Sequence, residues 1–220
     1  MTLFFRPFFA AAMIAMLVAG AVAGGPGNSW DVGAMRAMVG LRSAWPGVIP
    51  WVVALTNLGA APVTLGATAI ASLTLLRRAP AATLLLALTV LIERSLVDAF
   101  KDWIGRPRPS IGAIGLPHSL AYPSAHAANS MTAFLAIALI AAPPAYRRPM
   151  LMGAVVLSIA VGLSRIYLGV HWPSDVIGGW ALGLLAVTIA LAVGKRSGAL
   201  DEQHQIVGVH RPALDEDEPA

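Results

Sequence analysis

Long apolar runs separated by short polar connectors dominate the chain. A transmembrane helix needs about 20 mostly apolar residues. Six stretches meet this requirement, at roughly 4–23, 51–76, 80–100, 124–142, 150–170 and 175–194. The pattern therefore predicts an all-α fold: a polytopic membrane protein with a bundle of six transmembrane helices in one domain, residues 1–196.

The first apolar stretch has two interpretations. It ends in Ala-Val-Ala-Gly at 21–24, which resembles a signal-peptidase site after an apolar core, yet Arg6 is the only basic residue before that core. We expect a retained helix. Cleavage would leave the orientation of the remaining helices unchanged.

Two segments depart from the long apolar runs. Residues 28–45 mix apolar and polar positions at helical spacing, which predicts a short helix lying on the outer membrane surface, with an irregular loop as the alternative. Residues 197–220 are polar and end in Asp-Glu-Asp-Glu-Pro-Ala, so we expect a disordered cytoplasmic tail. His204 and His210 lie in this tail and are expected to be incidental.

The distribution of lysine and arginine sets the expected orientation. Two Arg-Arg pairs, at 77–78 and 147–148, occupy connectors on one side, whereas the cations on the other side gather in loops that also hold His and Asp. If the second group is functional, the arginine pairs decide the topology. Both termini are then cytoplasmic, and the loops at 24–50, 101–123 and 165–175 face outside.

The composition narrows the classes of function. The chain is 57% hydrophobic and 12% charged, whereas about a quarter of the residues of a soluble domain are charged. Cysteine is absent, which excludes disulfides, thiolate metal sites and cysteine nucleophiles. No dense Lys/Arg cluster with interleaved aromatic residues occurs, so we expect no nucleic-acid partner.

Three outer segments carry chemistry: KDWIGRPRP at 101–109, YPSAH at 122–126, and SRIYLGVHWPSD at 164–175. Pro123 and Pro173 mark helix starts, because proline is favoured at the first helical position. Helix N-termini attract anions through their unpaired N–H groups and positive dipole end.

Three cations add fixed positive charge near these helix starts, namely Lys101, Arg108 and Arg165. Such a site suits phosphate, which Arg binds bidentately and Lys as a point charge. Two histidines, His126 and His171, can divide the remaining work, one attacking phosphorus and the other protonating the leaving oxygen.

A carboxylate near the nucleophilic histidine completes this hypothesis. Asp175 follows His171 closely and is placed to fix the tautomer of that imidazole. On this interpretation Arg165 holds the anion, His171 attacks, and Asp175 orients His171. No outer carboxylate cluster is available to hold Mg²⁺.

Other charged residues receive a structural interpretation. Arg36, Arg42 and Arg106 are expected to be interfacial anchors, as most cations flanking spans are. In the third span, one-turn spacing places three charged residues on one helical face, namely Arg94, Asp98 and Lys101. We expect a self-neutralising ion-pair ladder there, with a polar wall of the substrate cleft as the alternative. Glu93 is left without a role.

Together, the three segments resemble the type 2 phosphatidic acid phosphatase superfamily of membrane lipid phosphatases. That family's pattern is Lys-x6-Arg-Pro, then Pro-Ser-Gly-His, then Ser-Arg-x5-His-x3-Asp. The matching residues, in chain order, are Lys101, Arg108, Pro109, Pro123, Ser124, His126, Ser164, Arg165, His171 and Asp175. Ala125 replaces the family's glycine, which affects only a backbone donor, and a helical Ala125 still presents its N–H. The order of the motifs and the six spans also match.

The resemblance implies a metal-independent mechanism without a cofactor. His171 would form a phosphohistidine with the support of Asp175, and His126 would protonate the leaving group and then activate water. The phosphoryl oxygens would be bound by Lys101, Arg108, Ser124, Arg165 and the backbone at Ala125.

The expected partner is a phosphorylated lipid at the outer face of a bacterial inner membrane. Undecaprenyl diphosphate is favoured, with phosphatidic acid, phosphatidylglycerol phosphate and a lipid A phosphate as further candidates. Three other functions stay open: a lipid phosphotransferase, a non-catalytic protein that binds or transports an anionic lipid, and a vanadate-dependent haloperoxidase. The last is disfavoured by the apolar spans.

Overall fold

The computed structural model describes residues 7–115 and 118–200, and within them every regular element is helical. The elements, in chain order, are α1 (Pro7–Ala23), α2 (Ser29–Ala44), η2 (Pro46–Val48), α3 (Ile49–Asn57), α4 (Ala61–Leu75), α5 (Pro80–Ile104), α6 (Ala125–Ala136), η3 (Ile137–Ala141), α7 (Pro144–Tyr167) and α8 (Pro173–Arg196). The all-α prediction is confirmed. The predicted tail from 201 onward, with His204 and His210, lies outside the described residues.

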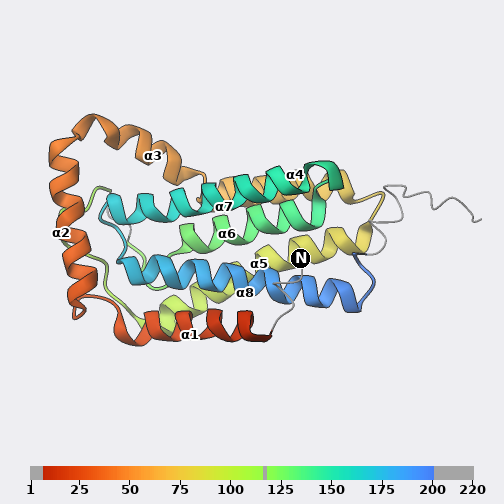
Figure 1. Ribbon diagram of the computed structural model, residues 1–220, viewed down its shortest axis with the longest axis horizontal. Coiled ribbons are helices and arrows are strands. Elements are labelled where there is room, and N and C mark those ends of the chain that lie inside the picture. The colour runs from red at the N-terminus through yellow and green to blue at the C-terminus, as the bar shows by residue number, and fades with distance from the viewer. Residues whose placement is uncertain (1–6, 116–117, 201–220) are drawn as a thin grey trace, which may run out of the picture.

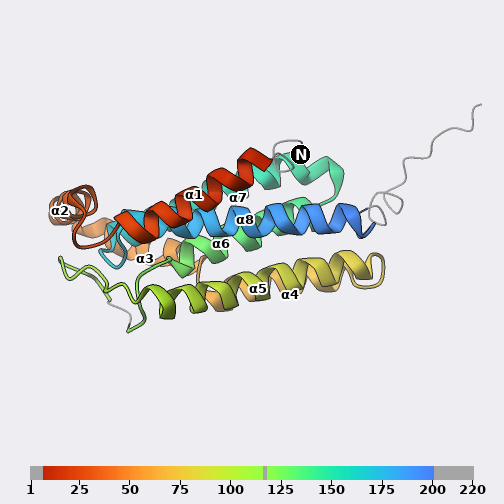
Figure 2. The same cartoon turned by 90° about the horizontal axis from the view of Figure 1, so that it is seen from below.

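Most helices run lengthwise along the molecule, and α2 lies across one end (Figure 1). Figure 2 shows α2 almost end-on while α1, α5 and α8 lie in the plane of view. The chain turns by 97° between α2 and the following helical segment, Pro46–Asn57. Helix α2 matches the helix predicted at 28–45, so the irregular-loop alternative is wrong. Its position on the outer membrane surface stays a prediction. Asn28 caps it by accepting hydrogen bonds from the N–H groups of Trp30 (2.9 Å) and Asp31 (3.1 Å).

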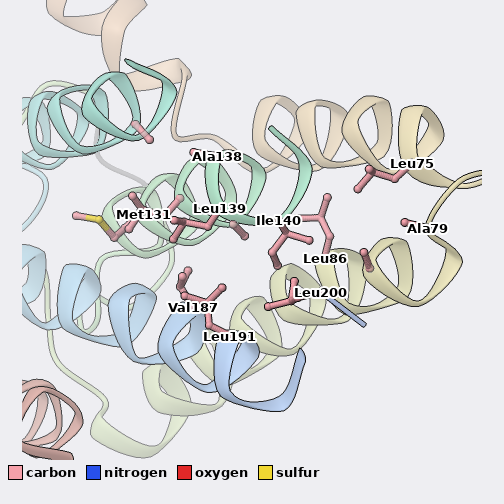
Figure 3. Close-up of a cluster of buried hydrophobic side chains, with 14 residues drawn as sticks. Leu75, Ala79, Leu86, Met131, Ala138, Leu139, Ile140, Val187, Leu191 and Leu200 are labelled. Carbon is pink, nitrogen blue, oxygen red and sulfur yellow. The ribbon is translucent and has the colours of Figure 1, made fainter. Parts of the chain in front are cut away.

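Helix α6 occupies the middle of the bundle and packs against α5, α7 and α8. Its apolar residues and those of η3 form one buried cluster with residues of α5 and α8. The cluster includes Met131, Leu139 and Ile140 together with Leu86 and Leu191 (Figure 3). The cluster therefore fixes the position of α6 relative to both neighbours.

Glycines on α8 bring its first half close to α6. A Cβ atom on Gly179 would lie 2.6 Å from the carbonyl oxygen of Ser124, and one on Gly183 would lie 2.9 Å from that of Ala128. Only glycine fits at such distances. The starts of α6 and α8, which carry two of the three motifs, are consequently held side by side.

The number of spans is only partly settled by helix length. Within residues 7–115 and 118–200, three helices, α5, α7 and α8, are long and apolar enough to cross a membrane, and a fourth span results if the bent segment Ser29–Asn57 counts as one. The shorter apolar helices are α1, α4 and α6 with η3. The predicted second span at 51–76 is broken into α3 and α4 at residues 58–60.

Candidate active site

The three predicted segments meet at the end of the bundle that α2 crosses (Figure 1). The predicted site residues all lie at helix ends or in connectors: Lys101 in the last turn of α5, Arg108 in the connector after it, Ser124 at the N-cap of α6, Ala125 and His126 in its first turn, Arg165 in the last turn of α7, His171 between α7 and α8, and Asp175 in the first turn of α8. Helix ends can place charged groups together because neighbouring helices end at one level.

His171 is buried, with 1% of its surface exposed. Its Nδ1 lies 3.3 Å from Oδ2 of Asp175, and its Nε2 lies 2.8 Å from Nη1 of Arg108. A guanidinium group can only donate, so Nε2 is the accepting nitrogen and Nδ1 carries the proton that Asp175 accepts. This tautomer directs the Nε2 lone pair toward the cations of the site.

The surroundings of His171 keep its imidazole neutral. Burial lowers the pKa of His171 well below its ordinary value, and the positive charges of Arg108, Arg165 and Lys101 lower it further. A neutral imidazole is the form that can attack an electrophile. The lowered pKa therefore favours the neutral imidazole of His171 at neutral pH.

Asp175 is fully buried and bound on both oxygens. Oδ2 accepts a hydrogen bond from the backbone N–H of Trp172 at 2.9 Å, and Oδ1 forms an ion pair with Nη1 of Arg106 at 2.8 Å. The Trp172 contact is the return half of a capping box, which places a carboxylate against the positive end of α8. These two contacts fix the position of the Asp175 carboxylate independently of His171.

The Arg108 side chain is held by backbone oxygens. Its Nε donates to the carbonyl of Ser119 at 2.5 Å, and Nη1 donates to the carbonyl of Val170 at 2.6 Å. Burial lowers the pKa of Arg108 to about 10, which leaves the group charged at neutral pH. The guanidinium is therefore a rigid positive group next to Nε2 of His171.

Two more cations are buried nearby. Lys101 donates from Nζ to the carbonyl of Leu120 at 2.6 Å. Arg165 donates from Nη1 to Oγ1 of Thr56 on α3 at 3.1 Å, while its Nε has no hydrogen-bond partner among the described residues. Each keeps donor capacity for an anion, and a buried donor without a partner calls for a ligand or water.

The start of α6 offers three further polar groups: the hydroxyl of Ser124, the N–H of Ala125 and the imidazole of His126. Ser124 is fully buried and its Oγ has no partner among the described residues. Ala125 is the first residue of α6 and its φ is not positive. The methyl group in place of the family's glycine therefore causes no backbone strain, and the N–H of Ala125 stays at the helix N-terminus. His126 is half-buried. Gly59 lies against it, because a Cβ there would be 2.8 Å from the His126 carbonyl oxygen.

Two arginines expected to be membrane anchors are instead buried, which corrects the prediction. Arg106 binds Asp175, and Arg42 donates from Nη2 to the carbonyl of Gly112 at 2.7 Å and from Nη1 to the carbonyl of Tyr167. Arg36 is exposed, as an anchor would be. A signal for Arg106 was available. Arg106 and Arg108 both precede proline, which favours extended backbone, and side chains two residues apart in such a segment share a face.

The predicted ion-pair ladder on α5 is wrong. Among the described residues, the ion pairs are those of Asp175 with Arg106 and His171, and none joins Arg94, Asp98 or Lys101. Asp98 is exposed, whereas Lys101 turns inward to the carbonyl of Leu120. Residues on one helical face can differ in burial because the face spans both the edge and the centre of a packed surface.

In the described part of the chain, no three His, Cys, Asp or Glu side chains come close enough to hold a metal ion. An apolar groove of about 700 Å³ lies between α2, α3, α7 and α8, and none of the charged site residues lines it. Two residues of the third motif, Ser164 and Pro173, line the groove, so it lies beside that segment.

Comparisons with known proteins agree with the geometry. The sequence profile of the PAP2 superfamily matches residues 82–198. Phosphatidylglycerophosphatase B of Bacillus subtilis is 36% identical over 107 residues, which is 46% of this chain and 53% of that protein. Decaprenylphosphoryl-5-phosphoribose phosphatase of Mycobacterium tuberculosis is 36% identical over 107 residues, 47% of this chain and 56% of that protein. The chain thus spans about half the length of these curated relatives.

A solved structure extends the likeness to most of the chain. The crystal structure described as the first transmembrane PAP2 type phosphatidylglycerolphosphate phosphatase from Bacillus subtilis matches with a TM-score of 0.79 and 26% identity, over 86% of this chain and 97% of that one. The profile match includes all three motifs and covers more than half of the 220 residues. The resemblance noted in the motifs is confirmed, and the chain belongs to the PAP2 superfamily.

Proposed function

We propose that this chain is a membrane lipid phosphatase that hydrolyses a phosphate ester or diphosphate through a phosphohistidine at His171. One observation carries the proposal: a buried, neutral imidazole is held by Asp175 on one nitrogen and presents its other nitrogen to Arg108. A protein that only binds an anionic lipid needs the cations but not this orientation of a histidine.

In the first step, Nε2 of His171 attacks phosphorus and the bond from phosphorus to the lipid oxygen breaks. Arg108, Arg165 and Lys101 would bind the phosphoryl oxygens, with Ser124 and the N-terminus of α6 as further donors. Such preorganised donors are each worth about 3–4 kcal/mol at developing negative charge. His126 would supply the proton to the departing lipid oxygen. Burial and the neighbouring cations lower the pKa of His126 to about 3, so this role requires the bound phosphate to neutralise those cations and raise that pKa.

In the second step, water attacks the phosphorus of the phosphohistidine and the P–N bond breaks. His126, now neutral, accepts the proton of that water, and phosphate leaves with the imidazole of His171 restored. Positioned proton transfer of this kind is worth about 10²–10⁴-fold in rate. Asp175 stabilises the positive charge that the imidazole carries while phosphorylated.

The bilayer would be crossed six times by a single domain at residues 1–196. Helices α1, α5, α7 and α8 supply four of these spans, α6 with η3 the fifth, and α3 followed by α4 the sixth. The arginine pairs at 77–78 and 147–148 then lie at the end opposite the catalytic cluster, which supports cytoplasmic termini and an outward-facing site. The location would be a bacterial inner membrane.

The substrate would be a lipid whose phosphate lies at the membrane surface. The matched relatives are named for phosphatidylglycerophosphate, decaprenylphosphoryl-5-phosphoribose, undecaprenyl diphosphate and lipid A. All four carry an anionic phosphate on a long apolar anchor. We keep undecaprenyl diphosphate and phosphatidylglycerol phosphate as the first substrates to test.

The test is phosphate release by the detergent-purified protein in EDTA, with His171→Ala measured in parallel. The panel holds undecaprenyl diphosphate, phosphatidic acid, phosphatidylglycerol phosphate and a lipid A phosphate. We expect release that survives EDTA and is abolished by His171→Ala. Rapid acid-free quenching with ³²P-labelled substrate should trap label on wild-type protein only.

Two outcomes would contradict the proposal. Near-wild-type release by folded His171→Ala protein would exclude the phosphohistidine. No release from any of the four lipids, with binding retained, would favour the binding or transport alternative. Label recovered on a second lipid instead of as free phosphate would identify a phosphotransferase.

A further inference from the structure

Arg106 connects the carboxylate of the proposed nucleophile pair to α1. Its Nη1 donates to Asp175 Oδ1 at 2.8 Å and to Ser174 Oγ at 3.2 Å. Its Nη2 donates to the carbonyls of Gly20 at 2.6 Å and Ala21 at 2.8 Å. With 5% of its surface exposed, the guanidinium binds α1 and the start of α8 at once.

An aromatic ring fixes the plane of the same guanidinium. The Cζ atom of Arg106 lies 4.5 Å from the centroid of the Tyr122 ring, a distance typical of a cation–π contact. The Tyr122 hydroxyl in turn donates to the carbonyl of Leu17 on α1. Arg106 is therefore held on three sides, and its position determines where Oδ1 of Asp175 can lie.

A second buried carboxylate supports this arrangement from α2. Asp31 is fully buried and accepts hydrogen bonds from the backbone N–H of Ser174 at 3.0 Å, its Oγ at 2.6 Å, and the N–H of Gly25 at 2.6 Å. Because the Ser174 hydroxyl donates to Asp31, its oxygen is free to accept from Arg106. A continuous chain of hydrogen bonds thus joins Asp31, Ser174, Arg106 and Asp175.

We propose that Arg106 is a positioning residue that, supported by Asp31, fixes Asp175 and through it the tautomer and direction of His171. Helices α1 and α2, which lie outside the matched region at 82–198, would then complete the catalytic apparatus. This inference rests on the proposed function, in which His171 is the nucleophile. It adds a role that the three motifs do not include.

A double-mutant cycle separates positioning from a general structural role. Arg106→Gln is expected to lower kcat about 10–100-fold with little change in KM, the usual range for groups that orient a reacting residue. If Arg106 acts through Asp175, the same substitution should change kcat less than about threefold in the Asp175→Asn background, because contacting residues that act together are non-additive. An equal loss in both backgrounds would overturn the proposal.

Conservative and control variants keep the test interpretable if folding suffers. Arg106→Lys retains the charge and should restore part of kcat, whereas Asp31→Asn should lower kcat in the same direction as Arg106→Gln. Arg36→Gln removes an exposed arginine of α2 and should behave as wild type. Unfolding midpoints in detergent give the folded fraction. A loss of kcat that tracks the midpoint across all variants, without partial recovery in Arg106→Lys, would also overturn the inference.

A spectroscopic readout distinguishes failure of this inference from failure of the proposed function. In ¹⁵N-histidine NMR spectra, with His171 assigned by His171→Ala, the wild-type imidazole should show the Nδ1–H tautomer even if no lipid is hydrolysed. Arg106→Gln should give a mixture of tautomers. Unchanged His171 shifts in that variant would refute positioning, whereas an inactive wild type would refute only the phosphatase activity.

Discussion

The Asp175→Asn substitution tests the proposed mechanism most directly, because it changes the proton position on His171. It also removes the charge paired with Arg106 and, where the NH₂ group replaces Oδ2, the acceptor of the Trp172 N–H. An asparagine that keeps its oxygen toward Arg106 must turn its NH₂ group toward His171. That group can only donate, so Nδ1 of His171 must become the acceptor. The proton then moves to Nε2, the nitrogen that would attack phosphorus.

The size of the effect follows from the geometry. In the Ser-His-Asp triad, an Asp-to-Asn change that produces the wrong tautomer lowers kcat by about 10⁴. Here the Nδ1 to Oδ2 distance is 3.3 Å, longer than the roughly 2.7–2.9 Å of a strong charged hydrogen bond. We therefore expect a loss of about 10³–10⁴ in kcat, or about 4–5 kcal/mol of barrier.

The substitution also removes the charge that balances Arg106. Breaking a buried ion pair by removing one partner typically costs about 3–5 kcal/mol, and the retained amide oxygen and the nearby Asp31 reduce this. A lower unfolding midpoint is expected, so rates must be normalised to folded protein.

The assay combines steady-state phosphate release with single-turnover trapping of ³²P on the protein. Asp175→Asn should show slow release and slow labelling with KM nearly unchanged. Asp98→Asn is the matched control, since that carboxylate is exposed on α5 and should leave both rates intact. Activity of folded Asp175→Asn protein within tenfold of wild type would refute the assigned tautomer.

Three further predictions follow from the site and the core. Burial and neighbouring cations lower the pKa of His171, and burial raises the pKa of Asp175 to about 6. The acid limb of kcat/KM therefore reports protonation of this pair and should lie below pH 6.5. Arg108→Gln removes a cation beside His171 and should move the limb upward; an unmoved limb in a pH–rate profile would contradict this. Ser124→Ala should lower kcat/KM about 10–100-fold through one lost bond to a charged group, yet leave the unfolding midpoint unchanged because Ser124 makes no capping hydrogen bond. Glu93→Met should raise the unfolding midpoint in detergent. Both carboxylate oxygens of the buried Glu93 lack partners among the described residues, and such groups cost about 1–3 kcal/mol each. A lower midpoint would show that Glu93 has a partner.

The clustering of the proposed catalytic residues could be predicted from sequence because these residues follow helix boundaries. Proline and serine mark the starts of α6 and α8, and the spacing of His171 and Asp175 places them at one helix start. The fold class followed from the apolar runs for the same reason, since a bilayer requires helices to satisfy backbone hydrogen bonds. Helix breaks inside an apolar run, such as the one between α3 and α4, leave no comparable mark in hydropathy.

Charged residues on regular faces were harder to interpret. One-turn spacing on α5 suggested a ladder, but spacing gives only the direction of a side chain and not what covers it. Asp98 is exposed, and Lys101 is buried at the end of the same helix. Arg106 is the opposite case. Its position next to a membrane span predicts an interfacial anchor, whereas the structure buries it against Asp175, in a segment whose direction two prolines constrain.

Helix α2 shows why the buried charges of the N-terminal region could not be assigned from its pattern. Its buried residues, Asp31, Met35 and Arg42, lie on one face, and an amphipathic helix on a membrane would be expected to keep that face apolar. The two charges instead bind complementary helix ends. Asp31 accepts from the backbone N–H of Ser174 in the first turn of α8, and Arg42 donates to the last carbonyl of α7, as helix dipoles favour. Since the connector between those ends carries His171, α2 is bound to both sides of the proposed nucleophile, and its charged inner face is explained by the partners it binds.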